Sequence, residues 1–230
     1  MLGGCCCAPD DGKEAAIIDE GPVGLKEEPV LKQVEADPPA ALPGFGLELV
    51  RTEVVPTSAP LGLVLDPSSK RALYVCKLAD GEQHAAAVAN SKAPEGGRVQ
   101  PGDFVIAESA ALAAENMPPV ETMLTDLSQC QQVKLRVMRP YEFTITVDKS
   151  GGSLGCDIKY DNHIGTSLVI DGMKEGAVME WNKANPSRAV QAGDHLIAVS
   201  GAGGSAVALL GKIKDANTTV DLSFARCTWV

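Results

Sequence analysis

The strongest constraint on the fold is an internal repeat. The stretch VQPGDFVIAESA begins at Val99, and VQAGDHLIAVSG begins 91 residues later, at Val190. Similar segments at such a distance indicate one structural unit that occurs twice. A chain of 230 residues with 45% hydrophobic side chains can give each of two such units its own core. The sequence therefore predicts two domains.

Other segments recur around this GD motif. PLGLVLD (60–66) and SLGCDIK (153–159) each place a glycine between apolar residues upstream of their GD motif. Apolar alternation then resumes in ALYVCKL (72–78) and SLVIDGM (167–173), as is typical of strands. Each unit should therefore contain a strand, a glycine turn and two strands, followed by a short helix and the GD turn with its strand.

A helical pattern and a closing strand complete each unit. Pro119 and Ser205 are suitable helix starts. Apolar residues follow them at spacings of three, four and seven, namely Val120, Leu124 and Leu127 in one copy and Ala206, Leu209, Leu210 and Ile213 in the other. The alternating segments QVKLRVMR (132–139) and TVDLSFAR (219–226) then predict final strands, and both end in arginine.

Taken together, these motifs resemble those of PDZ domains, in tandem over roughly residues 44–228. The resemblance implies a mostly β fold with α-helices, in which each domain is a small, partly open barrel or sandwich of five to six strands with two helices. The expected boundaries are a tail at 1–43, one domain at 44–139 and a second at 140–230. The first copy departs from the family at Ala59-Pro60 and at Ser109-Ala110, so the second copy matches better.

The resemblance also implies a peptide-binding groove in each copy. Backbone N–H groups of the glycine loop can hold a terminal carboxylate, and the following strand can pair with the peptide. The residues implied in the second copy are Lys149, Ser153, Leu154, Gly155, Cys156, Asp157, Ile158, Ala206, Leu210 and Ile213. Those implied in the first are Pro60, Leu61, Gly62, Leu63, Leu65, Val120, Leu124 and Leu127. The alternative is that these apolar side chains simply fill a core.

Ligand preference depends on the start of the second helix of each unit. In the family, a histidine there binds Ser or Thr at the third residue from the peptide's end. Here the position falls on Val120 and Ala206, or on Ser205 if the register slips by one. We therefore expect apolar or undemanding side chains at that place in the ligand. The chain's own ending, Thr228-Trp229-Val230, resembles a ligand for the PDZ domain of another protein.

The N-terminal segment has a different composition. Residues 8–39 hold nine acidic residues, three lysines, several prolines and no aromatic residue, which predicts a disordered tail over 1–43. Cys5, Cys6 and Cys7 are candidate acceptors for S-palmitoylation, whereas Leu2 excludes N-myristoylation. Peripheral attachment to a membrane and a merely exposed cysteine cluster both remain open.

Several classes of function are disfavoured. The net charge of −10 without a basic stripe argues against nucleic-acid binding. His84, His163 and His195 lack partners at catalytic or metal-ligand spacing, and Ser150-Gly151-Gly152 is only superficially like a serine-protease motif, so we expect no enzyme, metal or cofactor. Seven cysteines without a CxxC pair, and no secretory signal, favour the cytoplasm, at the inner membrane face if the cysteines are acylated.

The sequence thus predicts a non-enzymatic scaffold or adaptor that binds C-termini or extended segments of partner proteins. One alternative is a structural module whose grooves are closed. The other is a regulatory partner of a protease.

Overall fold

The structure is a computed structural model, and it describes residues 45–50, 61–70, 72–108, 119–129 and 132–228. Several expectations lie outside these residues: the tail at 1–43 with Cys5, Cys6 and Cys7, the loop residue Pro60, and Trp229 and Val230 at the end of the chain.

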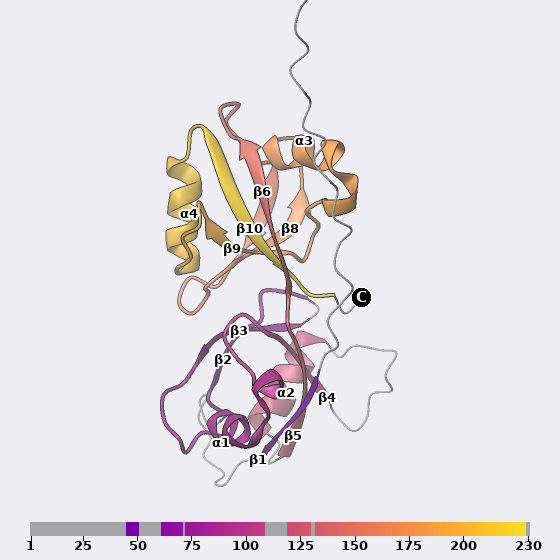
Figure 1. Ribbon diagram of the computed structural model, residues 1–230, viewed down its shortest axis with the longest axis vertical. Helices are drawn as coiled ribbons and strands as arrows, with labels where there is room; N and C mark the ends of the chain where they lie inside the picture. The colour runs from indigo at the N-terminus through magenta and orange to yellow at the C-terminus, as the bar shows by residue number, and fades with distance from the viewer. Residues whose placement is uncertain (1–44, 51–60, 71, 109–118, 130–131, 229–230) are drawn as a thin grey trace, which may run out of the picture. The chain divides into compact units, whose positions relative to one another are not determined.

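In the first repeat, the residues that the structure describes form five strands and two α-helices (Figure 1). Its elements are β1 (Phe45–Val50), β2 (Leu63–Asp66), β3 (Leu73–Leu78), α1 (Ala85–Lys92), a 3-10 turn (Glu95–Gly97), β4 (Phe104–Glu108), α2 (Val120–Gln129) and β5 (Gln132–Met138). The strands form one antiparallel sheet in the order β1-β5-β4-β3-β2.

The second repeat has the same sequence of elements. They are β6 (Tyr141–Asp148), β7 (Cys156–Lys159), β8 (Leu168–Met173), α3 (Ala177–Ala184), a 3-10 turn (Pro186–Arg188), β9 (His195–Val199), α4 (Ala206–Asp215) and β10 (Thr219–Arg226). The sheet order, β6-β10-β9-β8-β7, is that of the first repeat, element for element. The expected fold class is therefore confirmed: mostly β with α-helices, with five strands and two α-helices in the described part of each repeat. In each unit the strand after the glycine loop, β2 or β7, lies at a sheet edge.

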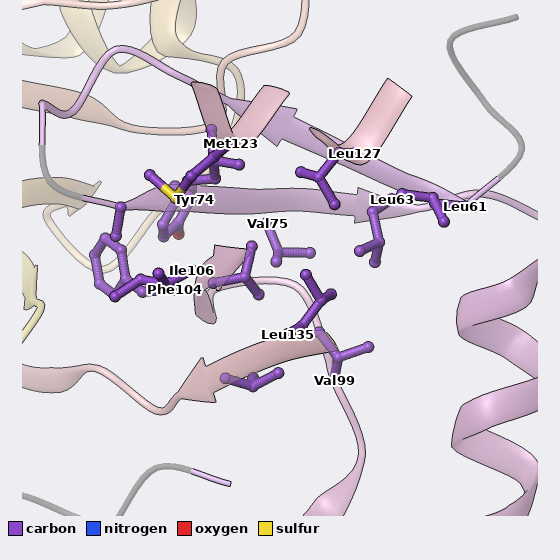
Figure 2. Packing of buried hydrophobic residues seen from close by; sticks show 14 of the residues in the cluster. Leu61, Leu63, Tyr74, Val75, Val99, Phe104, Ile106, Met123, Leu127 and Leu135 are labelled. Carbon is purple, nitrogen blue, oxygen red and sulfur yellow. The ribbon is translucent and has the colours of Figure 1, made fainter. Parts of the chain in front are cut away.

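Binary patterning places a core beneath each sheet. Along β6, the apolar residues Phe143, Ile145 and Val147 are buried, and the residues between them are exposed. The helix α4 packs on β8 and β9, and α3 packs on β6 (Figure 1). The core of the first repeat is filled by the side chains that Figure 2 labels, among them Phe104, Met123 and Leu135.

A hydrogen-bond network explains why the stretch VQxGD occurs twice. In the second repeat, the Asp194 carboxylate accepts from the N–H of Gln191 (2.8 Å) and from Nε and Nη2 of Arg226 (2.7 Å each). The side chain of Asn182, on α3, bonds both to the carbonyl of Val190 (2.9 Å) and to its N–H (2.8 Å). We call Asn182, Val190, Gln191, Asp194 and Arg226 the turn network. It ties α3 and the end of β10 to the turn before β9.

The first repeat contains the same network. Asn90 bonds both backbone groups of Val99, and Asp103 accepts from the N–H of Gln100 and from Arg139. Gly102 and Gly193 both have φ of +95°, which only glycine adopts readily. This backbone conformation explains why a glycine precedes the aspartate in both motifs. The arginines that end both closing strands in the sequence are thus the partners of the two buried aspartates.

Candidate functional site

A cavity of about 350 Å³ lies in the second repeat, between the loop that precedes β7 and the last turn of α4. Its lining combines loop backbone, apolar side chains and two lysines: Lys149, Gly152, Ser153, Leu154, Gly155, Cys156, Ile158, Ile213 and Lys214. Seven of the ten residues that the sequence implied for this groove are therefore brought together around one hollow.

The loop takes its shape from a glycine and from backbone bonds behind it. Gly155 has φ of +77°, and a Cβ there would lie 2.7 Å from the carbonyl oxygens of Lys174 and Glu175. The N–H groups of Ala177 and Val178, at the start of α3, donate to the carbonyls of Ser153 (3.1 Å) and Leu154 (3.0 Å). The loop is therefore fixed from the side away from the cavity, by groups that a ligand would not touch.

Strand pairing sets the direction of the loop's amides. The carbonyl of Gly155 accepts from the N–H of Lys174 at 2.7 Å, on the β8 side. In an antiparallel pair the next residue directs its N–H and C=O the opposite way, so the N–H of Cys156 faces the open edge of β7. The N–H of Gly155 has another acceptor, because it donates to the hydroxyl oxygen of Ser153 at 3.1 Å.

Two lysines give the cavity a positive character. The half-buried Lys149 donates from Nζ to the carbonyl of Ala216, 2.6 Å away, just past the end of α4. Lys214, on the last turn of α4, is exposed and lines the cavity. Sequence reasoning missed Lys214, although it is four residues after Leu210 and so on the same helix face.

Three of the implied residues do not line the cavity. Asp157 lies on the opposite face of β7, where its carboxylate pairs with Nζ of Lys174 at 2.5 Å. Ala206 is buried at the start of α4, and its N–H donates to the carbonyl of Gly165 (2.8 Å). Leu210 is half-buried against the core. Ser205 is the helix N-cap, as expected for a helix start, and its hydroxyl accepts from the N–H of Ala208 (3.2 Å).

The thiol of Cys156 is an apolar part of the lining. Burial, assisted by the charge of Asp157, raises the pKa of Cys156 to about 11. Its sulfur lies 3.9 Å from the sulfur of Met173. The group is therefore a neutral thiol near pH 7, suited to contact with an aliphatic side chain rather than to nucleophilic chemistry.

The first repeat holds its glycine loop with the same backbone hydrogen bonds. The carbonyls of Leu61 and Gly62 accept from the N–H groups of Ala86 (3.0 Å) and Ala79 (2.9 Å), as their counterparts do in the second repeat. Leu61, Leu63, Val120 and Leu127 are all buried in the core, as Figure 2 shows for three of them. In the second repeat the counterparts Leu154, Ala206 and Ile213 are buried too, and only Cys156 is half-buried. Leu65 is half-buried, and Leu124 is 36% exposed on α2.

The side chains considered for a catalytic role lie apart in the described residues. His84 precedes α1, His163 is exposed in the loop after β7, and His195 is buried on β9, while Ser150 lies in the turn after β6. Within the described residues there is no group of three or more metal-binding side chains. In that same part of the chain, no helix has the length and apolar character to cross a bilayer.

Comparisons with known proteins add two structural likenesses. No protein-family model and no curated protein matches the chain. Among solved structures, PDZ45 of INAD in complex with an NG2 peptide is 17% identical, with a TM-score of 0.33, and the match covers 81% of this chain and 91% of that one. The PDZ domain of choanoflagellate GIPC bound to a B1AR peptide is 21% identical, with a TM-score of 0.31, covering 39% of this chain and 94% of that one.

The assignment of the fold rests on the elements themselves. Each repeat has a glycine loop entering an edge strand, a short helix before a GD turn, and a second helix before the closing strand. The class that these features define is the PDZ-like fold, and this chain carries it twice, in tandem.

Proposed function

We propose that the chain is a non-enzymatic adaptor whose second repeat binds C-termini or extended segments of partner proteins. A partner peptide would add an antiparallel strand to the free edge of β7, with its last residue over the cavity at the start of that strand. The observation that carries the proposal is this coincidence of an open strand edge with a cavity lined by loop backbone and lysines.

The lining favours an aliphatic last residue. Leu154, Cys156, Ile158 and Ile213 provide an apolar surround, and burying a Val or Leu side chain there contributes about 1.5–3 kcal/mol. Lys149 and Lys214 favour the negative charge of a terminal carboxylate. The start of α4 offers Ala206 instead of a histidine, so Ser or Thr at the third residue from the end gains no special partner.

The first repeat favours a structural role. Its Leu63 is 7% exposed, whereas the counterpart Cys156 is half-buried. The other counterparts, Val120 to Ala206 and Leu127 to Ile213, are buried in both repeats. A side chain that already fills a core, as Leu63 does, has little surface to offer a ligand. We therefore assign the binding of partners to the second repeat, and the closed-groove alternative applies to the first repeat alone.

A pair of matched glycine substitutions tests this assignment. Gly155→Val in the full chain should abolish peptide binding, because it distorts the loop whose amides face the ligand. Gly62→Val is the matched control, since Gly62 has nearly the same φ, +73°, and a Cβ there would meet His84 at 2.5 Å. Titration of fluorescent C-terminal peptides measures both variants, and retained binding by Gly155→Val refutes the site.

Lys214→Glu is a milder second variant, because Lys214 is exposed and its change leaves the core intact. We expect about fivefold weaker binding at low salt, with the difference shrinking at high salt as the charges are screened. Equal affinity of the variant and the wild type at low salt would remove Lys214 from the site.

A further inference from the structure

The hydroxyl of Ser153 already holds one of the amides that a terminal carboxylate would need. The N–H of Gly155, the middle amide of the loop, donates to Ser153 Oγ at 3.1 Å. Ser153 is exposed, and it is also part of the cavity lining. The serine oxygen therefore occupies the position from which a ligand oxygen would accept a hydrogen bond from the N–H of Gly155.

This bond is not needed to shape the loop. The backbone of the loop is held by Ala177 and Val178 through the carbonyls of Ser153 and Leu154, and by Lys174 through the carbonyl of Gly155. On the loop itself these bonds use carbonyl groups alone, so none of them occupies the N–H of Gly155. The Ser153 hydroxyl thus satisfies a donor in a loop that other groups already hold in place.

The effect of this hydrogen bond on ligand choice depends on which loop N–H groups a bound peptide buries. A peptide that buries a backbone N–H without giving it an acceptor loses the free energy of its bond to water. A loop with three unsatisfied amides would therefore discriminate strongly against a ligand that lacks a carboxylate. A loop whose middle amide is satisfied internally penalises such a ligand less.

We propose that Ser153 determines the kind of peptide end that the second repeat accepts. Its hydroxyl stands in for one carboxylate oxygen, so the groove accepts internal extended segments, whose chain continues past the loop, as well as free C-termini. This inference rests on the proposed peptide binding at β7. In the first repeat, the corresponding residue in the sequence is Pro60, which has no hydroxyl.

The test compares one peptide in two forms, as a free C-terminal acid and as a C-terminal amide. The full chain is labelled with ¹⁵N, and the affinity of each form is taken from the amide signals of Leu154, Gly155 and Cys156, which report on the second groove alone. The quantity measured is the ratio of the two dissociation constants, amide over acid.

We expect Ser153→Ala to raise this ratio about fivefold, because the freed N–H of Gly155 then requires an acceptor from the ligand. Ser153→Thr retains a hydroxyl and should keep the wild-type ratio. An unchanged ratio in Ser153→Ala, or an equal weakening of both forms, overturns the inference and leaves Ser153 as a structural residue of the loop. If neither form shifts the three signals in the wild type, peptide binding itself is refuted instead.

Discussion

The side chain of His195, on β9, is fully buried and has an unusual hydrogen-bonding environment. Its Nδ1 lies 2.9 Å from the hydroxyl oxygen of Ser167. Within the described part of the chain, its Nε2 has no partner. Burial lowers the pKa of His195 to about 3, so the ring stays neutral in the folded protein. At the same place in the first GD motif stands Phe104, which does not titrate.

This histidine should make stability depend on pH. The unfolded chain binds a proton at His195 below about pH 6.5, and the folded chain does not until about pH 3, so the free energy of unfolding falls as pH falls through this window. The slope approaches about 1.4 kcal/mol per pH unit for this one proton. Urea unfolding between about pH 7 and pH 5 should therefore show a smaller loss for His195→Phe than for the wild type. Parallel losses in the two proteins would contradict the neutral buried ring.

Among the elements, β10 is held at its end by the turn network. Asp194 is 2% exposed at its side chain and Arg226 is 20% exposed, and the guanidinium also lies 4.9 Å from the ring centre of Phe143. Loss of one member of such a pair leaves a buried charge without compensation, which is far costlier than loss of an exposed ion pair.

We expect Arg226→Met to destabilise the second repeat by about 3 kcal/mol, since the Asp194 carboxylate would remain buried alone. The matched control is Lys183→Met, which removes the exposed pair of Lys183 and Glu180, 63% and 68% exposed, and should cost less than about 1 kcal/mol. Urea unfolding followed by tryptophan fluorescence measures both, because Trp181 and Trp229 belong to residues 140–230. Similar midpoints for the two variants would show that the network adds little stability.

The elements could largely be predicted from local pattern. Alternation of apolar and polar residues predicted the strands β3, β5, β8 and β10, and Pro119 and Ser205 predicted the starts of α2 and α4. These signals are encoded within a few residues of the chain. The partners of Lys149 and Ser153 could not be predicted, since Ala216 and the N–H of Gly155 meet them only after the loop has folded. The burial of Leu63 and the exposure of Leu124 likewise depend on how each helix rotates over its sheet.

On the scale of the whole molecule, charge and cysteine are concentrated before the first repeat. Residues 8–39 carry nine acidic residues against three lysines, and Cys5, Cys6 and Cys7 precede them. Two acyl chains anchor a protein stably where one does not, and the acidic stretch would keep the following residues away from an anionic lipid surface. We propose a chain that is cytoplasmic and attached to the inner membrane face through these cysteines.

If the cysteines are acylated in cells, replacement of all three by serine should move the protein from the membrane fraction to the soluble fraction. Hydroxylamine should also release a thioester-linked label from the wild type. Cys227→Ser is the control, because it changes a cysteine at the other end of the chain and should leave the distribution unchanged. Identical fractionation of the triple variant and the wild type would exclude the anchor.

The turn network has one further consequence, for how such a chain can change over generations. Asn182, Val190, Gln191, Asp194 and Arg226 all belong to one repeat, and their five counterparts all belong to the other. Duplication of a gene segment that encodes one repeat therefore copies a complete set of these bonds. The sequence of the peptide-facing loop can then change in either copy while the turn network still holds the closing strand in place. The loops already differ in this way, with Pro60 in one copy and Ser153 in the other.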